Sequence, residues 1–160
     1  FNYTDTADKG TDYLCSISYV VNGGYAYVLD VVYDDNKNEI TEPIVTDSLQ
    51  KNAVNTCYIE SNNGGRAFSR NVDRLSKDIG NGKTVFRPFH QSKNKEARIL
   101  SNASNVMNHI IMPYDWVVRF PKFAKDVTGF LSSMKNPHDD AADTLTGVYE
   151  KSLKSEFYAG

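Results

Sequence analysis

The sequence predicts one α/β domain with a mixed β-sheet that is flanked by helices on both faces. Two observations support this prediction. After an opening hairpin, short strand-like runs alternate with longer segments of helical spacing. The 160 residues are 40% hydrophobic and 24% charged, which is typical of a globular domain with a real core. Because 160 residues are the length of one ordinary domain, residues 1–160 are expected to form a single domain.

The hairpin is indicated by Asn22-Gly23-Gly24, a turn sequence between two runs of aromatic and β-branched residues. Pro43 is expected in the first turn of the helix that follows, and Pro121 interrupts a later helix. An earlier strand contains Asp5. From the hairpin on, the predicted elements are strands 11–21 and 25–33, helix 44–54, strand 56–60, helix 66–79, strand 84–89, helix 95–107, a short edge strand within 109–113, helix 115–133 and a last helix from the aspartates at 139–140 to about 153.

Acidic residues stand at the ends of three of these elements. Asp5 is in the first strand, with Asp8 and Asp12 after it, and Glu60 closes an apolar strand before Asn62-Asn63-Gly64-Gly65. The last helix opens with three more, Asp139, Asp140 and Asp143. Taken singly, the helix aspartates fit capping, and Asp5 and Asp8 fit turns. Together, at strand ends where α/β sheets bind ligands, they favour a site for a hard cation such as Mg²⁺ or Mn²⁺.

A basic stripe lies on the helix predicted after Glu60. Arg66, Arg70, Arg74 and Lys77 share one helical face. From 60 to 100 the chain has nine basic and four acidic residues, although its total charge is -2. A positive flank beside an acidic cleft suits a nucleic acid backbone; the alternative is a solvated helix face. His90 and His138 are further candidates for phosphate or metal ligands.

Other chemistries have weaker support. Residues 80–84, GNGKT, lack the spacing of a Walker phosphate loop. Cys15 and Cys57 lie in apolar runs without a CxxC pattern, so we expect buried free thiols in a reducing compartment. No segment approaches the length of a membrane span. Since the chain does not begin with Met, we expect it to be part of a longer protein.

With these residues assembled, the chain resembles the C-terminal nuclease domain of tailed-bacteriophage terminase large subunits, which belongs to the RNase H-like superfamily with resolvases and integrases. The resemblance rests on DTADKGTDY (5–13), YIESNNGG (58–65), KEARI (95–99) and FPKF leading to PHDDAADTL (137–145). It implies an RNase H-like fold and a magnesium- or manganese-dependent endonuclease, with one or two ions, that cuts double-stranded DNA concatemers during viral genome packaging.

The resemblance also assigns roles to residues. Asp5, Glu60 and Asp140 become the catalytic acids, and Asp139 and Asp12 join them as metal ligands. Asp143 becomes a secondary acid that orients its neighbours. DNA contacts fall to the cations Arg66, Arg70, Arg74, Lys77, Lys95 and Arg98.

The implied partners are double-stranded DNA, an N-terminal packaging ATPase domain of the same polypeptide, the small terminase subunit and the portal, with no membrane. A phage-encoded protein of this kind acts in the host cell cytoplasm. Two alternatives stay open: a Holliday-junction resolvase or integrase-like nuclease, and a non-catalytic module that docks on DNA or the portal.

Overall fold

A single mixed sheet forms the centre of the computed structural model, which describes residues 1–7, 12–132 and 135–154. Within these residues the strand order is β5-β4-β1-β2-β3-β6. β2 runs antiparallel to β1 and β3, and the other pairs are parallel. The strands are β1 (Asn2–Asp5), β2 (Leu14–Asn22), β3 (Tyr25–Asp34), β4 (Thr56–Glu60), β5 (Val85–Phe89) and β6 (Ile110–Ile111).

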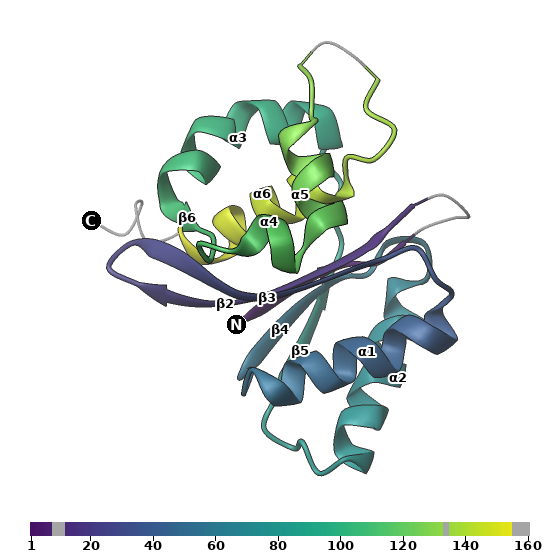
Figure 1. Ribbon diagram of the computed structural model, residues 1–160. Helices are drawn as coiled ribbons and strands as arrows, with labels where there is room; N and C mark the ends of the chain where they lie inside the picture. Colours follow the sequence, from purple (N-terminus) through teal and green to yellow (C-terminus); the bar gives the residue numbers. More distant parts are fainter. Residues whose placement is uncertain (8–11, 133–134, 155–160) are drawn as a thin grey trace.

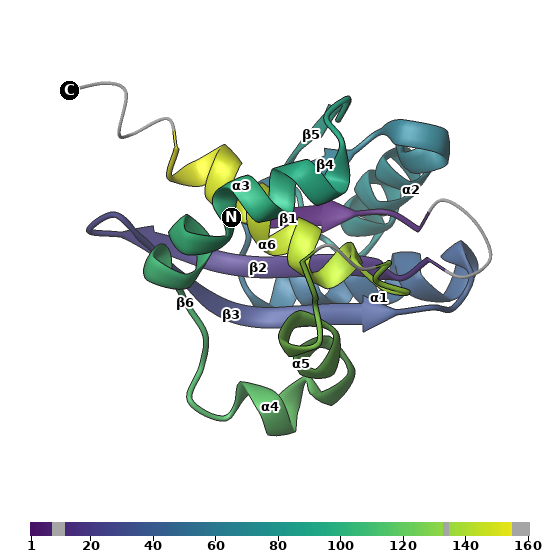
Figure 2. The same ribbon diagram turned by 90° about the horizontal axis from the view of Figure 1, so that it is seen from above.

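Helices cover both faces of this sheet, as predicted (Figure 1). One face carries α1 and α2, and the other carries α4, α5 and α6, with α3 packed on α6 (Figures 1 and 2). The helices are α1 (Asn38–Lys51), the 3₁₀ turn η1 (Asn62–Gly64), α2 (Gly65–Asp78), α3 (Lys95–His109), α4 (Trp116–Arg119), α5 (Pro121–Thr128) and α6 (Asp140–Ser152).

A separate apolar core fills each side of the sheet. Leu49, Ile59 and Phe68 are among the side chains buried under α1 and α2. Tyr3 and Val148 belong to the core between the sheet and α6. The cysteines are buried and free, as predicted. No helix among the described residues is long and apolar enough to cross a membrane.

Two predicted helices differ from the structure. α1 begins at Asn38 rather than at residue 44, so Pro43 lies inside the helix and not in its first turn. The added turn contributes buried Thr41 and Glu42, polar residues that a hydrophobic pattern cannot reveal. The predicted helix 115–133 divides at Pro121, as expected, but ends at Thr128 before Gly129.

The sheet edge that holds the acids depends on two close approaches at glycine. A Cβ at Gly65, the first residue of α2, would overlap the carbonyl oxygen of Glu60. Glycine therefore lets α2 begin directly beside the end of β4. A Cβ at Gly147 would overlap the Tyr3 ring, so this glycine lets α6 lie against β1. Both contacts fix where the acids of the three elements meet.

Gly147→Ala should push α6 away from β1, because its methyl group has no room beside the buried Tyr3 ring. We expect a loss of about 2 kcal/mol or more in unfolding free energy, measured by urea denaturation. Gly82→Ala is the matched control, since nothing lies within 4 Å of its Cβ position. Equal stability of the two variants would contradict this account of how α6 docks.

Candidate metal centre

Four buried carboxylates meet at the carboxyl edge of the sheet. Asp5 ends β1 and Glu60 ends the neighbouring parallel strand β4. The first turn of α6 adds Asp140 and Asp143. Between 0% and 6% of each residue is exposed. The predicted convergence of acids from three distant parts of the chain is therefore present.

Asp5, Glu60 and Asp143 form the tightest group. One carboxylate oxygen from each lies within 4.8 Å of the others. Opposite ligands of one Mg²⁺ are about 4.2 Å apart, so a small adjustment would let one ion reach all three. Beside them is a cavity of about 40 Å³ lined by Asp5, Thr6, Asp12, Glu60, Asn62, Lys95 and Asp140.

The buried oxygens of this group are met by cations rather than by hydrogen bonds. Asp5 Oδ2 and both carboxylate oxygens of Asp143 make no hydrogen bond, and the charges nearest to them are Lys95, 3.3 Å from Asp5 Oδ2, and Arg98, 2.6 Å from Asp143 Oδ1. Two cations beside four acids leave negative charge in excess, and an all-oxygen set of this kind suits Mg²⁺ or Mn²⁺. The residues present therefore fit a hard divalent cation.

Burial raises the pKa of Asp5 and of Asp143, so both carboxylates take up protons more readily than in water. Burial, followed by repulsion from Glu60, raises the pKa of Asp5 well above its ordinary value. Burial also raises the pKa of Asp143 to about 7, although Arg98 and Lys95 oppose the rise. A divalent cation would replace these protons.

Lys95 lies among the acids. Its Nζ is 2.7 Å from Asp140 Oδ1, 3.3 Å from Asp5 Oδ2, 3.6 Å from Asp139 Oδ1 and 3.9 Å from Asp143 Oδ2. Burial works against its charge, but the carboxylates outweigh burial and raise the pKa of the ammonium above its ordinary value. Lys95 is thus a resident counter-ion of the acidic cluster.

Arg98 is the second cation that balances the negative charge of the cluster. Its side chain is fully buried, and its Nη2 lies 2.6 Å from Asp143 Oδ1 and 3.7 Å from Glu60 Oε1. The same nitrogen donates to the backbone carbonyl of Asp143. This placement is at odds with the DNA contact predicted for Arg98, because a backbone phosphate cannot reach a guanidinium without exposed surface.

The remaining predicted acids surround the group. Asp140 accepts hydrogen bonds from the Tyr13 amide and from Lys95. The carboxylate group within 4.8 Å contains Asp143 and not Asp140, so the distances favour Asp143 as the third ligand, where the sequence predicted Asp140. Asp12 lines the cavity, and Asp139 is half-buried with its Oδ1 3.6 Å from Lys95 Nζ. Asp8 lies outside the described residues.

Sequence reasoning missed the contribution of Tyr3. Its buried hydroxyl donates a 2.5 Å hydrogen bond to Glu60 Oε1 and so orients that carboxylate. The only signal in the sequence is its position two residues before Asp5, on the same strand.

The four cations of the basic stripe on α2 are exposed, but only two of them form ion pairs with described residues. Lys77 pairs with Asp73 at 2.9 Å and Arg74 with Asp78 at 3.1 Å, each one helical turn apart. Arg66 and Arg70, nearer the cleft, have no ion pair with any described residue.

With this geometry in place, comparison with protein families is decisive. Residues 4–111 match the family described as terminase of bacteriophage T7, ribonuclease H-like domain. The chain belongs to this family. The match includes Asp5 and Glu60, and it confirms the predicted terminase resemblance and RNase H-like fold. No curated protein sequence matches the chain.

Solved structures share the fold over nearly the whole chain, α6 included. The human cytomegalovirus terminase nuclease domain, Mn-soaked and inhibitor-bound, has a TM-score of 0.61 at 10% identity, over 98% of this chain and 84% of that one. The nuclease domain of the bacteriophage SPP1 large terminase, with bound Mn, has 0.58 at 16%, over 95% and 85%. A fowlpox virus resolvase in complex with Holliday junction DNA has 0.53 at 8%, over 93% and 97%.

Mn²⁺ should stabilise this terminase domain more at pH 8 than at pH 5. Since the pKa of Asp143 is about 7 when folded against an ordinary value of 3.8, the metal-free fold binds a proton that the unfolded chain releases. Its stability should therefore fall as pH rises from about 4 to 7. Mn²⁺ at 100 times its Kd should add about 2.7 kcal/mol. Thermal unfolding with Mn²⁺ or EDTA measures both effects.

The matched control pair is Asp143→Asn and Asp47→Asn, the latter on an exposed face of α1. Asp143→Asn should weaken the pH dependence, leaving the part that comes from Asp5, and should lose the Mn²⁺ effect, while Asp47→Asn should keep both. A Mn²⁺ shift that survives Asp143→Asn would place the ion elsewhere.

Lys95→Met should destabilise the metal-free domain and tighten Mn²⁺ binding. The side chain is 39% exposed, so we expect a loss of only about 1–2 kcal/mol in EDTA. Mn²⁺ should restore this loss, because it supplies the missing positive charge. Calorimetric titration would contradict the counter-ion role if Lys95→Met bound Mn²⁺ more weakly than the unsubstituted chain.

Proposed function

We propose that this terminase domain is a divalent-metal-dependent endonuclease that cuts double-stranded DNA concatemers during viral genome packaging. The observation that carries the proposal is the convergence of Asp5, Glu60 and Asp143 within 4.8 Å at the sheet edge. Three buried carboxylates repel one another in a low-dielectric cleft. Such a group is costly for a module that only docks, and useful for one that must hold a cation.

Some residues of the site would bind the ion, and others orient the residues that bind it. Asp5, Glu60 and Asp143 would hold the ion, with Asp140, Asp139 and Asp12 at hand for a second one or for its water. Bound Mg²⁺ or Mn²⁺ supplies Lewis-acid chemistry for phosphodiester hydrolysis. Tyr3 orients Glu60 through its hydrogen bond, and Arg98 holds Asp143 by contact with its carboxylate and its backbone carbonyl. Both supports are buried, so they fix the ligands before DNA arrives.

Manganese is the first ion to test, since the cytomegalovirus and SPP1 nuclease domains are described with Mn. Membership in the terminase family supports the remaining parts of the proposal. These are an N-terminal packaging ATPase in the same polypeptide, the small terminase subunit and the portal as partners, and the host cell cytoplasm as the place of action.

A Holliday-junction resolvase is the second candidate, because the fowlpox resolvase shares the fold. The family match favours the terminase. Substrate preference separates the two: a resolvase should cut a four-way junction much faster than linear duplex, and a terminase nuclease should not.

Incubation of supercoiled plasmid with Mn²⁺ should produce nicked and linear DNA, and EDTA should prevent it. Asp5→Asn, Glu60→Gln and Asp143→Asn should each lower the cutting rate by about 100-fold or more, since each removes an ion ligand. Asp47→Asn is the control with the same chemical change on an exposed face. Full activity in the ligand variants would overturn the proposed centre, provided that circular dichroism shows them folded.

A further inference from the structure

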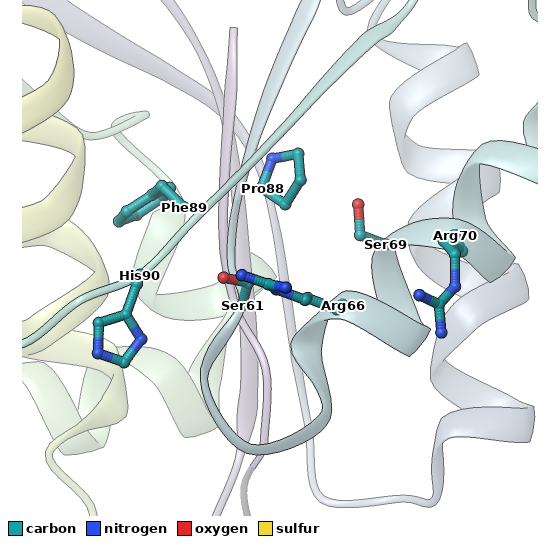
Figure 3. Close-up of a pocket in the computed structure, with 7 residues that line it drawn as sticks. All are labelled: Ser61, Arg66, Ser69, Arg70, Pro88, Phe89 and His90. Carbon is teal, nitrogen blue, oxygen red and sulfur yellow. The ribbon is translucent and has the colours of Figure 1, made fainter.

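A second pocket lies beside the metal centre, between the start of α2 and the end of β5 (Figure 3). It has a volume of about 380 Å³, and Arg66, Arg70, His90, Ser61 and Ser69 provide its polar lining. Arg66 reaches from α2 towards Ser61, with His90 on one side and Arg70 on the other (Figure 3). Every polar side chain of this lining can donate a hydrogen bond, and no carboxylate is among them.

The two arginines of this pocket are the unpaired members of the basic stripe. Asp73 and Asp78 neutralise Lys77 and Arg74 farther along α2. Arg66 and Arg70 have no such partner among the described residues, and both are exposed. A guanidinium that faces an open pocket without an acid is available for a phosphate, which it can bind through two parallel hydrogen bonds.

Backbone contacts hold this pocket against the metal centre. Glu60 and Asn62 face the metal cavity, whereas Ser61 between them lines the second pocket. The Ser61 amide donates to the Phe89 carbonyl at 2.8 Å. The Asn62 side chain exchanges two hydrogen bonds with the backbone of Gln91. The loops after β4 and β5 are thereby tied together, and His90 stays beside Ser61.

We propose that this pocket binds a backbone phosphate of the DNA strand that is cut, a few nucleotides from the scissile phosphate, through Arg66, Arg70 and His90. The proposal rests on the proposed nuclease function. Glu60, which ends β4, is the register partner of Phe89, which ends β5 and lines the pocket, so the pocket is one strand away from the acidic cluster. A phosphate near the one being cut can therefore enter the pocket while the acids hold their ion.

Duplex affinity measured in Ca²⁺, with a gel to show that the DNA stays uncut, tests this assignment. Arg66→Ala with Arg70→Ala should weaken binding of a 30-base-pair duplex by about 10-fold or more. The double variant should also reduce the slope of log affinity against log salt by about 1. His90→Gln should weaken binding in the same direction by a smaller factor.

The matched control is Arg74→Ala with Lys77→Ala, which removes two charges from the same helix. Because both side chains are paired with acids, we expect a change below about threefold. Equal losses in the two double variants would overturn the proposal, since they would show only the total charge of α2. Unchanged binding in Arg66→Ala with Arg70→Ala would also overturn it.

The ends of the duplex distinguish a backbone phosphate from a terminal one. The loss caused by Arg66→Ala with Arg70→Ala should be the same for duplexes with 5′-hydroxyl and with 5′-phosphate ends. A loss seen only with 5′-phosphate ends would assign the pocket to a terminal phosphate and overturn the backbone assignment.

Failure of this proposal and failure of the nuclease proposal give different results. If the pocket is unused, the double variant still cuts plasmid at the unsubstituted rate in Mn²⁺. If the domain is not a nuclease, no variant cuts, yet the binding difference between the two double variants persists. Mn²⁺-induced stabilisation in both double variants shows that the metal centre is intact.

Discussion

The repulsion among Asp5, Glu60, Asp140 and Asp143 is the constraint on which the rest of the structure depends. These carboxylates are almost completely buried at one edge of the sheet, and their charges must be compensated there. Both compensating cations, Lys95 and Arg98, come from α3. The packing of α3 on α6 is therefore specified by charge as well as by apolar contact. It keeps the acids in place without neutralising them fully, which leaves an attraction for a divalent cation.

The ends of the strands could be predicted from the sequence, but the rotation of α6 could not. Glu60 closes an apolar run and Asp5 ends a strand, so their meeting at one edge follows from sheet topology. In α6, however, nearly every residue from Asp140 to Tyr149 is buried. A helix that is buried all round has no apolar face to show which acid points inward. The contact between Gly147 and Tyr3 sets that rotation, and it turns Asp143 to the other two acids.

The partners of the basic residues were equally hard to predict from the sequence. Lys95 and Arg98 lie three residues apart on α3 and therefore share one face of the helix. Sequence alone does not tell whether that face meets DNA or acids from another helix. The pairing of Arg74 with Asp78 and of Lys77 with Asp73 was available, because residues four apart on a helix are neighbours. Of the four cations of the stripe, Arg66 and Arg70 are the two without an ion pair to a described residue, a difference that the charge count along the stripe did not reveal.

Opposite charges thus stand side by side on one sheet edge, which explains how a chain of net charge -2 can suit a polyanion. At physiological salt, charges are screened beyond about 8 Å, so a phosphate responds to the side chains around it and not to the total. Asp5, Glu60 and Asp143 would draw a divalent ion, and that ion would cancel the field that repels the scissile phosphate. In the proposed complex, Arg66 and Arg70 would bind a neighbouring phosphate and would need no ion. The metal would then decide whether DNA enters the cleft, while the pocket on α2 decides where along the backbone it comes to rest.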